Sequence, residues 1–484
     1  ETEVTADYVS DAVASGKVGE AFSLTANDAG GVFVGTANND TFNAEAGSLA
    51  GTTIAGQAGN DTLNATLTGA LTNTTKIQSV ENVNFDWNAF GTATVDAANI
   101  TGANNLTFTS SKLGYQGNVQ VDNAGDNTIV AGTGANGALD VNGGKNVTVN
   151  AGQAKTVTVD AAATGAVSAT VTAGAATTSI DVGSVTAFAT TNVTANVTVS
   201  KDATLAFLTQ AVETVNVTAA DGNKLTLADA SLLDKATITS DGSVTLVAGS
   251  DELTTHTLTN STAGLTIDLT SDTAADLSKV SYDLLNIKNA LAGDLTVASG
   301  ANLKAGVDLT SNQILATAGT SDVVNLNLTV DQTAIDVIDG TNDVETLNIA
   351  VDAADSETDG EIDVATLTAA AVAVSGASKV ALGNITANSV DASAVTGEVT
   401  LTEAAGANGA DITAVGSSTA KNTVKFATTT ADTSYTGGEG VDVVTMAQTT
   451  GDSTVVLGNG ANTYTNNTLT NGTAVVVGGA GVDT

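Results

Sequence analysis

The stretch Gly56-Gln-Ala-Gly-Asn-Asp61-Thr-Leu63 repeats, 21 residues further on, the pattern of Gly35-Thr-Ala-Asn-Asn-Asp40-Thr-Phe42. Each stretch places glycine, which permits tight turns, before an acidic residue, and then an apolar residue that can begin a strand. We call this pattern a glycine–acid turn. A turn that returns after a fixed interval predicts a chain wound into coils whose turns stack along one edge.

Three related turns stand near the other end of the chain. Each runs from a glycine to a carboxylate or a carboxamide: Gly437 to Asp442, Gly458 to Asn462 and Gly478 to Asp483. The final residues of these turns are 20 and 21 residues apart. Because the same interval occurs at both ends of the chain, we expect one coil length of about 20 residues throughout.

The middle of the chain has a second periodicity. Apolar residues lie ten residues apart, within alternating runs such as Asn-Val-Thr-Val-Asn, at Val119, Ile129, Leu139, Val149 and Val159. Alternation with period two indicates strands, and the ten-residue interval indicates two strands and two turns per coil. We therefore expect an all-β protein, a right-handed parallel β-solenoid or β-roll with about 20 residues per coil and a few short helical insertions.

Local patterns predict where the helices and block boundaries lie. Asp or Ser starts and leucine or alanine spacing predict short helices over 228–235, 275–285 and 365–373. The expected organisation is a lead-in segment followed by three solenoid blocks, the first with N-terminal glycine–acid turns, the second with helical insertions and the third with C-terminal glycine–acid turns: 1–30, 31–220, 221–350 and 351–484.

Composition suits a solenoid. The 484 residues include 50 glycines but no proline and no cysteine. A chain without proline keeps an N–H donor at every residue, which long β-ladders use. Aromatic residues are only 3% of the chain, so we expect a thin interior filled by small β-branched side chains. The absence of cysteine excludes a disulfide framework and a cysteine-based zinc site.

The charge balance is strongly acidic. The formal net charge is −38, from 52 acidic and 14 basic residues, and none of the basic residues is arginine. Phosphate binding needs basic patches, so nucleic acid is excluded as a partner. A mean hydropathy of +0.17 argues against disorder. We therefore expect bound cations to neutralise part of the excess charge.

The glycine–acid turns predict metal sites. Glycine lets backbone carbonyls approach a cation closely, and a hard cation such as Ca²⁺ prefers carbonyl and carboxylate oxygens. One site needs two neighbouring turns, so the pair and the triplet carry more weight than a single copy. The predicted ligands are Asp40, Asp61, Asp442, Asn462 and Asp483. An ordinary β-turn capped by Asp is the open alternative.

A second acidic run, Asp355-Ser-Glu357-Thr-Asp359-Gly-Glu-Ile-Asp363, matches most of an EF-hand-type loop. It has carboxylates at loop positions 1, 3, 5 and 9 and glycine at position 6, but Thr366 occupies position 12, where a bidentate Glu is expected. Asp355, Glu357, Asp359 and Asp363 are therefore candidate ligands of a partial calcium site. A solvated acidic loop is the open alternative.

A longer repeat is also visible. The pattern Val-Glu-x-Val/Leu-Asn, followed by an apolar residue, occurs three times, with its glutamates at Glu81, Glu213 and Glu345, 132 residues apart both times. A glycine–acid sequence precedes two of the copies and ends at Asp61 and Asp322. The equal spacing favours related solenoid blocks over coincidence.

The glycine–acid turns resemble the nonapeptide repeats of RTX proteins, Gly-Gly-x-Gly-x-Asp-x-apolar-x, and the stretches that begin at Gly437 and Gly478 match that pattern. Together with the Val-Glu pattern and the β-runs rich in Thr, Ala and Val, the chain is similar to RTX-type, type I secreted, calcium-binding surface-layer proteins of Gram-negative bacteria. The turn motif covers only a small part of the chain.

The resemblance implies a structural protein, not an enzyme, that forms a Ca²⁺-dependent two-dimensional lattice on the cell surface. It implies other copies of the chain as lattice partners, and calcium held by turn carbonyls and by Asp40, Asp61, Asp442 and Asp483. It also implies contact with lipopolysaccharide or the outer-membrane surface through a segment outside this chain. Because the chain begins at Glu1 rather than Met, we expect it to be part of a longer protein.

Two other functions are weighed against this one. Thr-x-Thr runs such as Thr156-Val-Thr158 would offer a ligand face in a calcium-stabilised adhesin or ice-binding arm. A β-helix polysaccharide lyase or hydrolase needs a strong base or paired carboxylates beside aromatic or basic subsites. The lack of arginine and the single tryptophan disfavour that enzyme. Trp87 is expected to pack in the core, with a sugar-binding platform as its alternative.

Overall fold

The structure is a computed structural model. It describes residues 18–109, 119–123, 129–131, 138–143, 146–150, 154–160, 167–172, 179–182, 193–199, 202–206, 212–228, 235–240, 242–249, 253, 257–260, 264–270, 274–310, 314–316, 321–337, 344–351, 360–406, 410–427, 430–447, 450–467 and 472–484.

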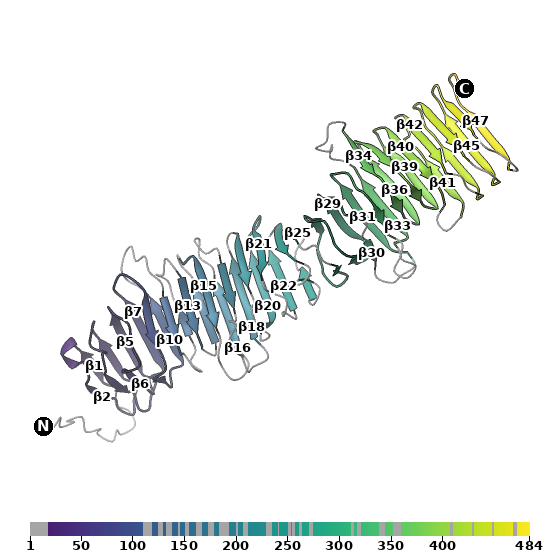
Figure 1. The fold of residues 1–484 in the computed structure, drawn as a ribbon. Coiled ribbons are helices and arrows are strands. Elements are labelled where there is room, and N and C mark those ends of the chain that lie inside the picture. The colour runs from purple at the N-terminus through teal and green to yellow at the C-terminus, as the bar shows by residue number, and fades with distance from the viewer. Residues whose placement is uncertain are drawn as a thin grey trace. The chain divides into compact units, whose positions relative to one another are not determined.

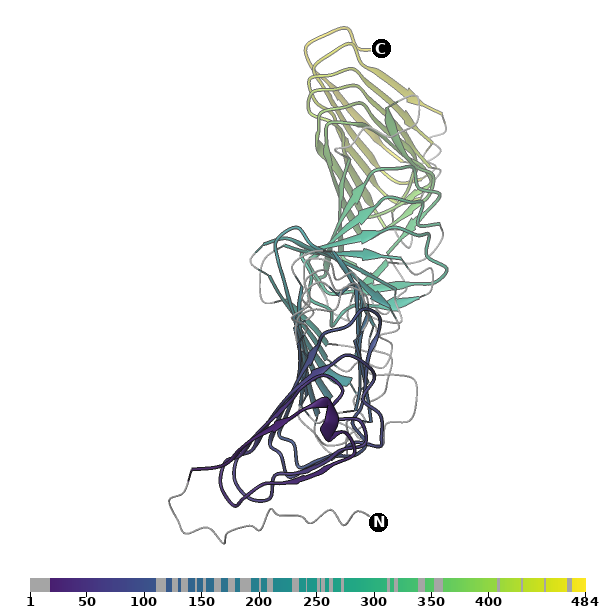
Figure 2. The same ribbon diagram turned by 90° about the vertical axis from the view of Figure 1, so that its left-hand side faces the viewer.

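The described chain is a parallel β-solenoid, as the sequence predicts. It divides into two compact units, an N-terminal unit of Glu1–Thr245 with Thr255–Ala263 and a C-terminal unit of Leu246–Thr254 with Gly264–Thr484. Successive strands of one face pair in parallel at the interval of one coil, as in the series Ala21, Thr41, Thr62 and Asn82. Figure 1 and its turned view, Figure 2, show these strands stacked side by side within each unit.

The described residues of the N-terminal unit form three parallel sheets, which we call A, B and C. Sheet A has 12 strands: β1 (Ala21–Leu24), β3 (Thr41–Ala44), β5 (Thr62–Leu67), β7 (Asn82–Trp87), β10 (Asn105–Thr109), β12 (Ile129–Ala131), β14 (Asn146–Asn150), β16 (Val167–Thr172), β18 (Val193–Val199), β20 (Val212–Ala219), β22 (Lys235–Ser240) and β24 (Thr257–Asn260). Sheet B consists of β2 (Val32–Val34), β4 (Thr53–Ala55), β6 (Lys76–Gln78) and β9 (Ile100–Thr101). Sheet C consists of β8 (Ala93–Asp96), β11 (Val119–Asp122), β13 (Ala138–Asn142), β15 (Thr156–Asp160), β17 (Ser179–Val182), β19 (Ala203–Ala206) and β21 (Lys224–Ala228). Strand β23 (Val244–Ala248) has residues in both units.

In the C-terminal unit, the part of the chain that the structure describes forms one long sheet and three shorter ones, which we call D, E, F and G. Sheet D consists of β25 (Leu265–Leu269), β27 (Leu284–Ile287), β29 (Ala301–Ala305), β31 (Val323–Leu328), β33 (Thr346–Ala350), β36 (Ala371–Gly376), β39 (Ser389–Val395), β41 (Ile412–Val415), β43 (Thr433–Thr436), β45 (Ser453–Gly458) and β47 (Ala474–Gly478). Sheet E consists of β26 (Ala275–Asp276), β28 (Leu295–Val297) and β30 (Ile314–Ala316), and sheet F of β32 (Ile335–Asp336), β35 (Leu367–Thr368) and β38 (Ile385–Thr386). Sheet G consists of β34 (Glu361–Val364), β37 (Lys379–Leu382), β40 (Val399–Ala404), β42 (Asn422–Phe426), β44 (Asp442–Met446) and β46 (Thr463–Asn466).

Columns of apolar side chains form the core. Period-two alternation sends every second side chain of a strand into the coil. In sheet D, Leu285, Leu303, Leu326 and Ile349 pair in register on successive strands, and each is at most 1% exposed. Burial of apolar area contributes roughly 25 cal/mol per Å², so each coil is stabilised mainly by the coils above and below it.

The ten-residue spacing in the middle of the chain corresponds to alternating sheets. Val119 lies in β11 of sheet C and pairs with Leu139, whereas Ile129 begins β12 of sheet A. Two strands per coil are therefore confirmed for this region. Leu139 pairs with Val157 rather than with Val159, so this coil is two residues shorter than the interval between Leu139 and Val159.

Two of the predicted helices are wrong. Segment 275–285 forms β26, a turn and the start of β27, and segment 365–373 forms β35 and the start of β36. Ala275 pairs with Leu295, and Leu367 pairs with Ile385. Stacking on the neighbouring coils buries these apolar residues, and this burial overrides the weak local helical preference. The third predicted helix, 228–235, lies mostly outside the described residues, and its ends belong to β21 and β22.

Part of the expected lead-in segment belongs to the solenoid. Strand β1 pairs with β3 because Phe22 and Leu24 point inward, and the Phe22 ring stacks on Phe42 at 4.6 Å. A 3₁₀ turn, η1 (Ala26–Asp28), follows and is capped by hydrogen bonds between Thr25 and the Asp28 carboxylate. No helix within the described part of the chain is long and apolar enough to cross a membrane.

Candidate metal centre

Both N-terminal turn aspartates are buried side chains at one corner of the solenoid. Asp40 and Asp61 directly precede β3 and β5 and are 1% and 0% exposed. Because Thr41 pairs with Thr62, the two aspartates occupy equivalent positions on successive coils, about 4.8 Å apart along the stack. The structure therefore brings together two residues that the sequence predicts as ligands.

The first glycine of each turn makes room for the carboxylate. A Cβ atom at Gly35 would collide with Asp40 Oδ2 and with the carbonyl oxygen of Gly56. A Cβ atom at Gly56 would likewise collide with Asp61 Oδ2 and with the carbonyl oxygen of Ser79. Each turn thus places a carboxylate oxygen beside a backbone carbonyl oxygen of the next coil, and only glycine leaves the space for both.

Backbone N–H groups link these carboxylates into a ladder. Glu20 N–H donates to Asp40 Oδ1 at 2.6 Å, and Asp40 N–H donates to Asp61 Oδ1 at 2.7 Å. Asp61 N–H in turn donates to Glu81 Oε2 at 2.7 Å. Each rung therefore joins one coil to the next. Glu81 is a member of the site that sequence reasoning did not assign as a ligand, although the Val-Glu pattern had singled it out.

The two aspartates differ in how fully their oxygens are bonded. The Thr36 N–H and hydroxyl both donate to the Asp40 carboxylate, with Thr36 N at 2.5 Å from Oδ2. Asp61 Oδ2 is buried, and among the described residues it has no hydrogen-bond partner. A buried carboxylate oxygen left without a partner is costly, so Asp61 Oδ2 is a place for a cation or for a proton.

The charges around Asp61 also favour a bound cation or a proton at its carboxylate. Burial is the main cause that raises the pKa of Asp61 to about 6, and the negative charges of Asp40 and Glu81 raise the pKa further. The hydrogen bond from the Asp40 N–H opposes these effects. Three carboxylates on consecutive coils thus repel one another, and a cation between the coils would relieve that repulsion.

The C-terminal turns form a related ladder, in which side-chain amides supply two of the rungs. Asn422 Nδ2 donates to Asp442 Oδ1 at 2.6 Å, and Asp442 N–H donates to Asn462 Oδ1 at 2.9 Å. Asn462 Nδ2 then donates to Asp483 Oδ1 at 3.0 Å. Asn422, Asp442 and Asn462 are all at most 1% exposed, whereas Asp483 is exposed. Sequence reasoning missed Asn422, although it lies one coil interval before Asp442.

The C-terminal ladder alternates amide and carboxylate, so it carries less charge than the N-terminal one. Burial raises the pKa of Asp442, while hydrogen bonds from Asn422, the Tyr435 hydroxyl and the Gly438 N–H oppose this rise. Burial and the nearby Asp442 also raise the pKa of the Tyr435 hydroxyl, which donates to Asp442 Oδ1 at 3.1 Å. Asn422 and Asn462, the neutral neighbours of Asp442 in the ladder, add no charge repulsion, and the hydrogen bond from Asn422 stabilises the Asp442 carboxylate. These amides therefore reduce the need for a cation at Asp442.

The EF-hand-type prediction falls mostly outside the described residues. Asp355, Glu357 and Asp359 are not among those residues. Asp363 lies in strand β34 with an exposed side chain, and its N–H donates to Asp331 Oδ1 at 2.8 Å. Gly360, loop position 6, has a positive φ of 69°, as the turn in such a loop requires. The calcium assignment of this loop stays a prediction.

The oxygens at the turns fit a hard cation in kind. They are carboxylate and backbone carbonyl oxygens, the ligands that Ca²⁺ prefers. The described residues contain no group of three or more His, Cys, Asp or Glu side chains placed to hold one ion. A bound cation would therefore take one or two carboxylates and complete its shell with turn carbonyls and water, with Asp40, Asp61, Asp442 and Asp483 as the acidic ligands.

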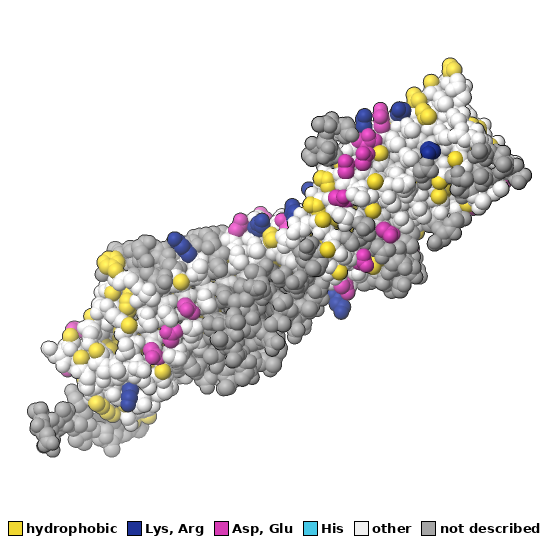
Figure 3. Space-filling view, in the orientation of Figure 1, with side chains coloured by type: hydrophobic (Ala, Val, Ile, Leu, Met, Phe, Trp, Pro, Cys, Tyr) yellow, Lys and Arg dark blue, Asp and Glu magenta, His cyan; other side chains and the backbone are white. Residues whose placement is uncertain are grey.

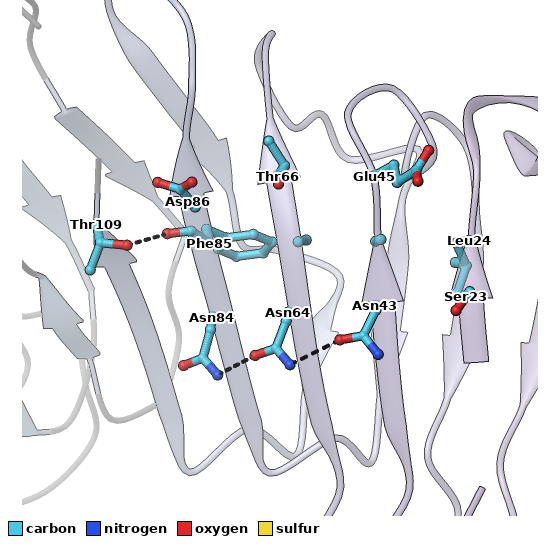
Figure 4. A pocket seen from close by; sticks show the side chains of 12 residues that line it. Ser23, Leu24, Asn43, Glu45, Asn64, Thr66, Asn84, Phe85, Asp86 and Thr109 are labelled. Carbon is cyan, nitrogen blue, oxygen red and sulfur yellow. Dashed lines mark hydrogen bonds between the residues drawn. The ribbon is translucent and has the colours of Figure 1, made fainter. Parts of the chain in front are cut away.

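A separate groove of about 410 Å³ is lined by residues of β1, β3, β5, β7 and β10 in sheet A. Figure 4 shows its row of carboxamides, in which Asn64 Nδ2 donates to Asn43 Oδ1 at 3.2 Å and Asn84 Nδ2 donates to Asn64 Oδ1 at 3.0 Å. Glu45 and Asp86 line the same groove. A carboxamide has two donors and an acceptor, so the row retains polar capacity toward solvent.

Trp87 is a core residue rather than a sugar-binding platform, because it is 5% exposed in β7.

Comparison of the chain with protein-family models finds no match, and none of the curated proteins is detectably similar to it.

Proposed function

We propose that this chain is a structural protein of a bacterial surface layer and that Ca²⁺ bound at its stacked acidic turns holds the coils together. The observation that supports calcium binding most directly is the N-terminal ladder of Asp40, Asp61 and Glu81, with a buried and unpartnered oxygen on Asp61. Stacked buried carboxylates are unfavourable unless they are paired with a cation or protonated.

Calcium dependence would couple folding to location. An ion that binds only the folded form adds RT ln(1 + [L]/Kd) to the free energy of unfolding. Low calcium inside the cell would leave the acidic turns uncompensated, and millimolar calcium outside would stabilise them. We therefore place the folded protein outside the cell, on its surface, after export by type I secretion.

The outer faces of the solenoid suit contacts between copies of the chain. Rows of Asn follow the coils, as in Asn302, Asn325 and Asn348, which are joined by hydrogen bonds of 3.0 and 2.8 Å. In the view of Figure 3, much of the described surface is backbone or side chains that are neither hydrophobic nor charged. A regular, uncharged surface can repeat the same contact with many neighbours, which a lattice of identical subunits needs.

The proposal is tested by imaging and spectroscopy of the purified protein in millimolar Ca²⁺ and in excess chelator. We expect two-dimensional sheets by negative-stain electron microscopy in Ca²⁺ only, and weaker β-sheet circular dichroism in chelator. The double variant Asp61→Asn/Asp442→Asn should lose most of the difference. Asp276→Asn removes a charge from an exposed position and is the control. Identical spectra in both buffers, without sheets in either, would overturn the proposal.

The groove on sheet A favours a second candidate function, a calcium-stabilised adhesin with a glycan ligand. Carboxamides and carboxylates are groups that hydrogen-bond sugar hydroxyls. Binding of the protein to a panel of immobilised polysaccharides tests this function. Asn64→Ala, in the centre of the groove, should weaken any binding, whereas Asn325→Ala, in the asparagine row of the C-terminal unit, should leave it unchanged.

A further inference from the structure

We propose that Asp322 and Glu345 form a further site for a hard divalent cation, in the C-terminal unit and outside the five glycine–acid turns. The identity of the ion as Ca²⁺ rests on the proposed function. The site itself rests on its own contacts. Asp322 directly precedes β31 and Glu345 directly precedes β33, and these strands pair in parallel with Val323 opposite Thr346.

The contact between Asp322 and Glu345 matches the contact between Asp61 and Glu81 in the N-terminal ladder. Asp322 N–H donates to Glu345 Oε2 at 2.6 Å, and Asp61 N–H donates to Glu81 Oε2 at 2.7 Å. In both cases the aspartate is the residue before a strand, and the glutamate is the residue before the paired strand of the next coil. The two corners therefore share one geometry, although they lie in different units.

A second observation points to a ligand. Asp322 is 8% exposed, and its Oδ2 is buried with no hydrogen-bond partner among the described residues, as is Asp61 Oδ2. The same oxygen is thus left unpartnered at both corners, on an aspartate whose backbone N–H donates to a glutamate carboxylate of the next coil. A cation that bridges the aspartate and the glutamate would satisfy this oxygen and offset the two negative charges.

The sequence pattern separates corners with a site from a corner without one. Both Glu81 and Glu345 have an aspartate at the matching place on the preceding coil. The third glutamate of the repeat, Glu213, follows a coil with no acidic residue between Asp181 and Asp202. We therefore expect a cation site only at those copies of the Val-Glu pattern whose preceding coil ends a turn in aspartate. Glu213, which lies within β20 between Val212 and Thr214, provides the control without that aspartate.

The experiment counts bound calcium and locates it. We compare the full chain with Asp322→Asn, Glu345→Gln and the control Glu213→Gln, by equilibrium dialysis with radioactive Ca²⁺ at saturating concentration. The first two variants should each bind one ion fewer per chain, whereas the control should bind as many as the wild type. Both test substitutions preserve side-chain shape, and circular dichroism checks that the variants fold.

Hydrogen exchange supplies the second measurement. Added Ca²⁺ should slow amide exchange of β31 and β33 in the wild type and in Glu213→Gln, and the slowing should be lost in Glu345→Gln. Slowing of β3 and β5 should persist in all three proteins. If Asp322→Asn and Glu345→Gln keep the wild-type ion count and the calcium-induced slowing, this site is refuted while calcium binding elsewhere stands. If the wild type binds no calcium, both this inference and the calcium part of the proposed function fail.

Discussion

At the scale of single residues, the buried turn aspartates combine two roles. Asp61 accepts a backbone N–H from the preceding coil through Oδ1, and its Oδ2 stays unpartnered. The first oxygen shapes the turn without any ion, and the second creates a need for a cation or a proton. Oδ1 therefore caps the turn, as the β-turn alternative in the sequence analysis predicts. Oδ2 is available to a cation, as the metal-site prediction requires.

The raised pKa of Asp61 predicts a pH dependence with a definite sign. Its folded pKa of about 6 lies above its ordinary value of 3.8, so the folded form binds the proton more tightly. The stability that protonation contributes is present at low pH and is lost as the pH rises through about 6. In chelator, the N-terminal coils should be more stable at pH 5 than at pH 7, by about 1–2 kcal/mol.

Hydrogen exchange of β3 and β5 at the two pH values, corrected for the intrinsic exchange rates, measures this difference. Asp61→Asn should remove most of the difference, because an amide does not titrate. Saturating Ca²⁺ should shrink it in the wild type. A stability of these coils that increases from pH 5 to pH 7 in chelator would contradict the role assigned to Asp61.

The glycine that faces each carboxylate predicts a steric effect. Gly437→Ala should destabilise the C-terminal coils by about 2–4 kcal/mol, because the new Cβ would collide with Asp442 Oδ2 and with the Leu457 carbonyl. Gly69→Ala is the control, since a Cβ there meets no atom within 4 Å. Thermal unfolding followed by circular dichroism compares the two variants. Equal effects would show that the carboxylate does not require glycine.

At the scale of elements, the two ladders place different side chains at equivalent positions of successive coils. The N-terminal ladder stacks carboxylates at the starts of β3, β5 and β7, whereas the C-terminal ladder alternates amides and carboxylates at the starts of β42, β44 and β46. An amide donates a hydrogen bond where a second carboxylate would repel. The C-terminal strands are therefore expected to depend less on calcium than the N-terminal strands.

Asn422 tests this difference. Asn422→Ala removes the donor to Asp442 Oδ1 and the acceptor of the Ser417 N–H, both in buried positions. We expect a loss of about 1–3 kcal/mol in the free energy of unfolding of the C-terminal coils. Asn64→Ala, on an exposed row, should change stability by at most about 0.5 kcal/mol. Chemical denaturation of both variants would measure this, and a similar small effect for each would contradict the ladder.

At the scale of the whole molecule, the stability of each solenoid unit is local, because coils touch mainly their neighbours. The chain nevertheless carries 52 acidic residues against 14 basic ones, so general salt screening also stabilises it. Specific calcium binding must therefore be separated from screening. Comparing Ca²⁺ with Mg²⁺ separates the two effects, because both ions carry the same charge. Mg²⁺ demands a tighter octahedral shell and gives up water reluctantly, so it should bind less well at a site built for Ca²⁺.

Millimolar Ca²⁺ should accordingly raise the melting temperature by several degrees more than Mg²⁺ at equal concentration, with NaCl matched for ionic strength as the baseline. Differential scanning calorimetry measures the three conditions. The calcium effect should appear mainly in the transition that contains the N-terminal coils. Equal shifts with Ca²⁺ and Mg²⁺ would reduce the effect to general screening.

Sequence periodicity by itself determined the parallel solenoid, its coil length and the inward side chains, because stacking makes one spacing recur in every coil. Phe42 and Leu63 are buried where the turn motif predicts. The tertiary structure alone decided which side chains meet across coils. Glu81 and Asn422 join the ladders, and Glu345 contacts Asp322, because strand pairing aligns residues about one coil apart, and no local pattern shows those contacts. The same pairing made 275–285 and 365–373 into strands and turns, since burial against neighbouring coils outweighs local helical propensity.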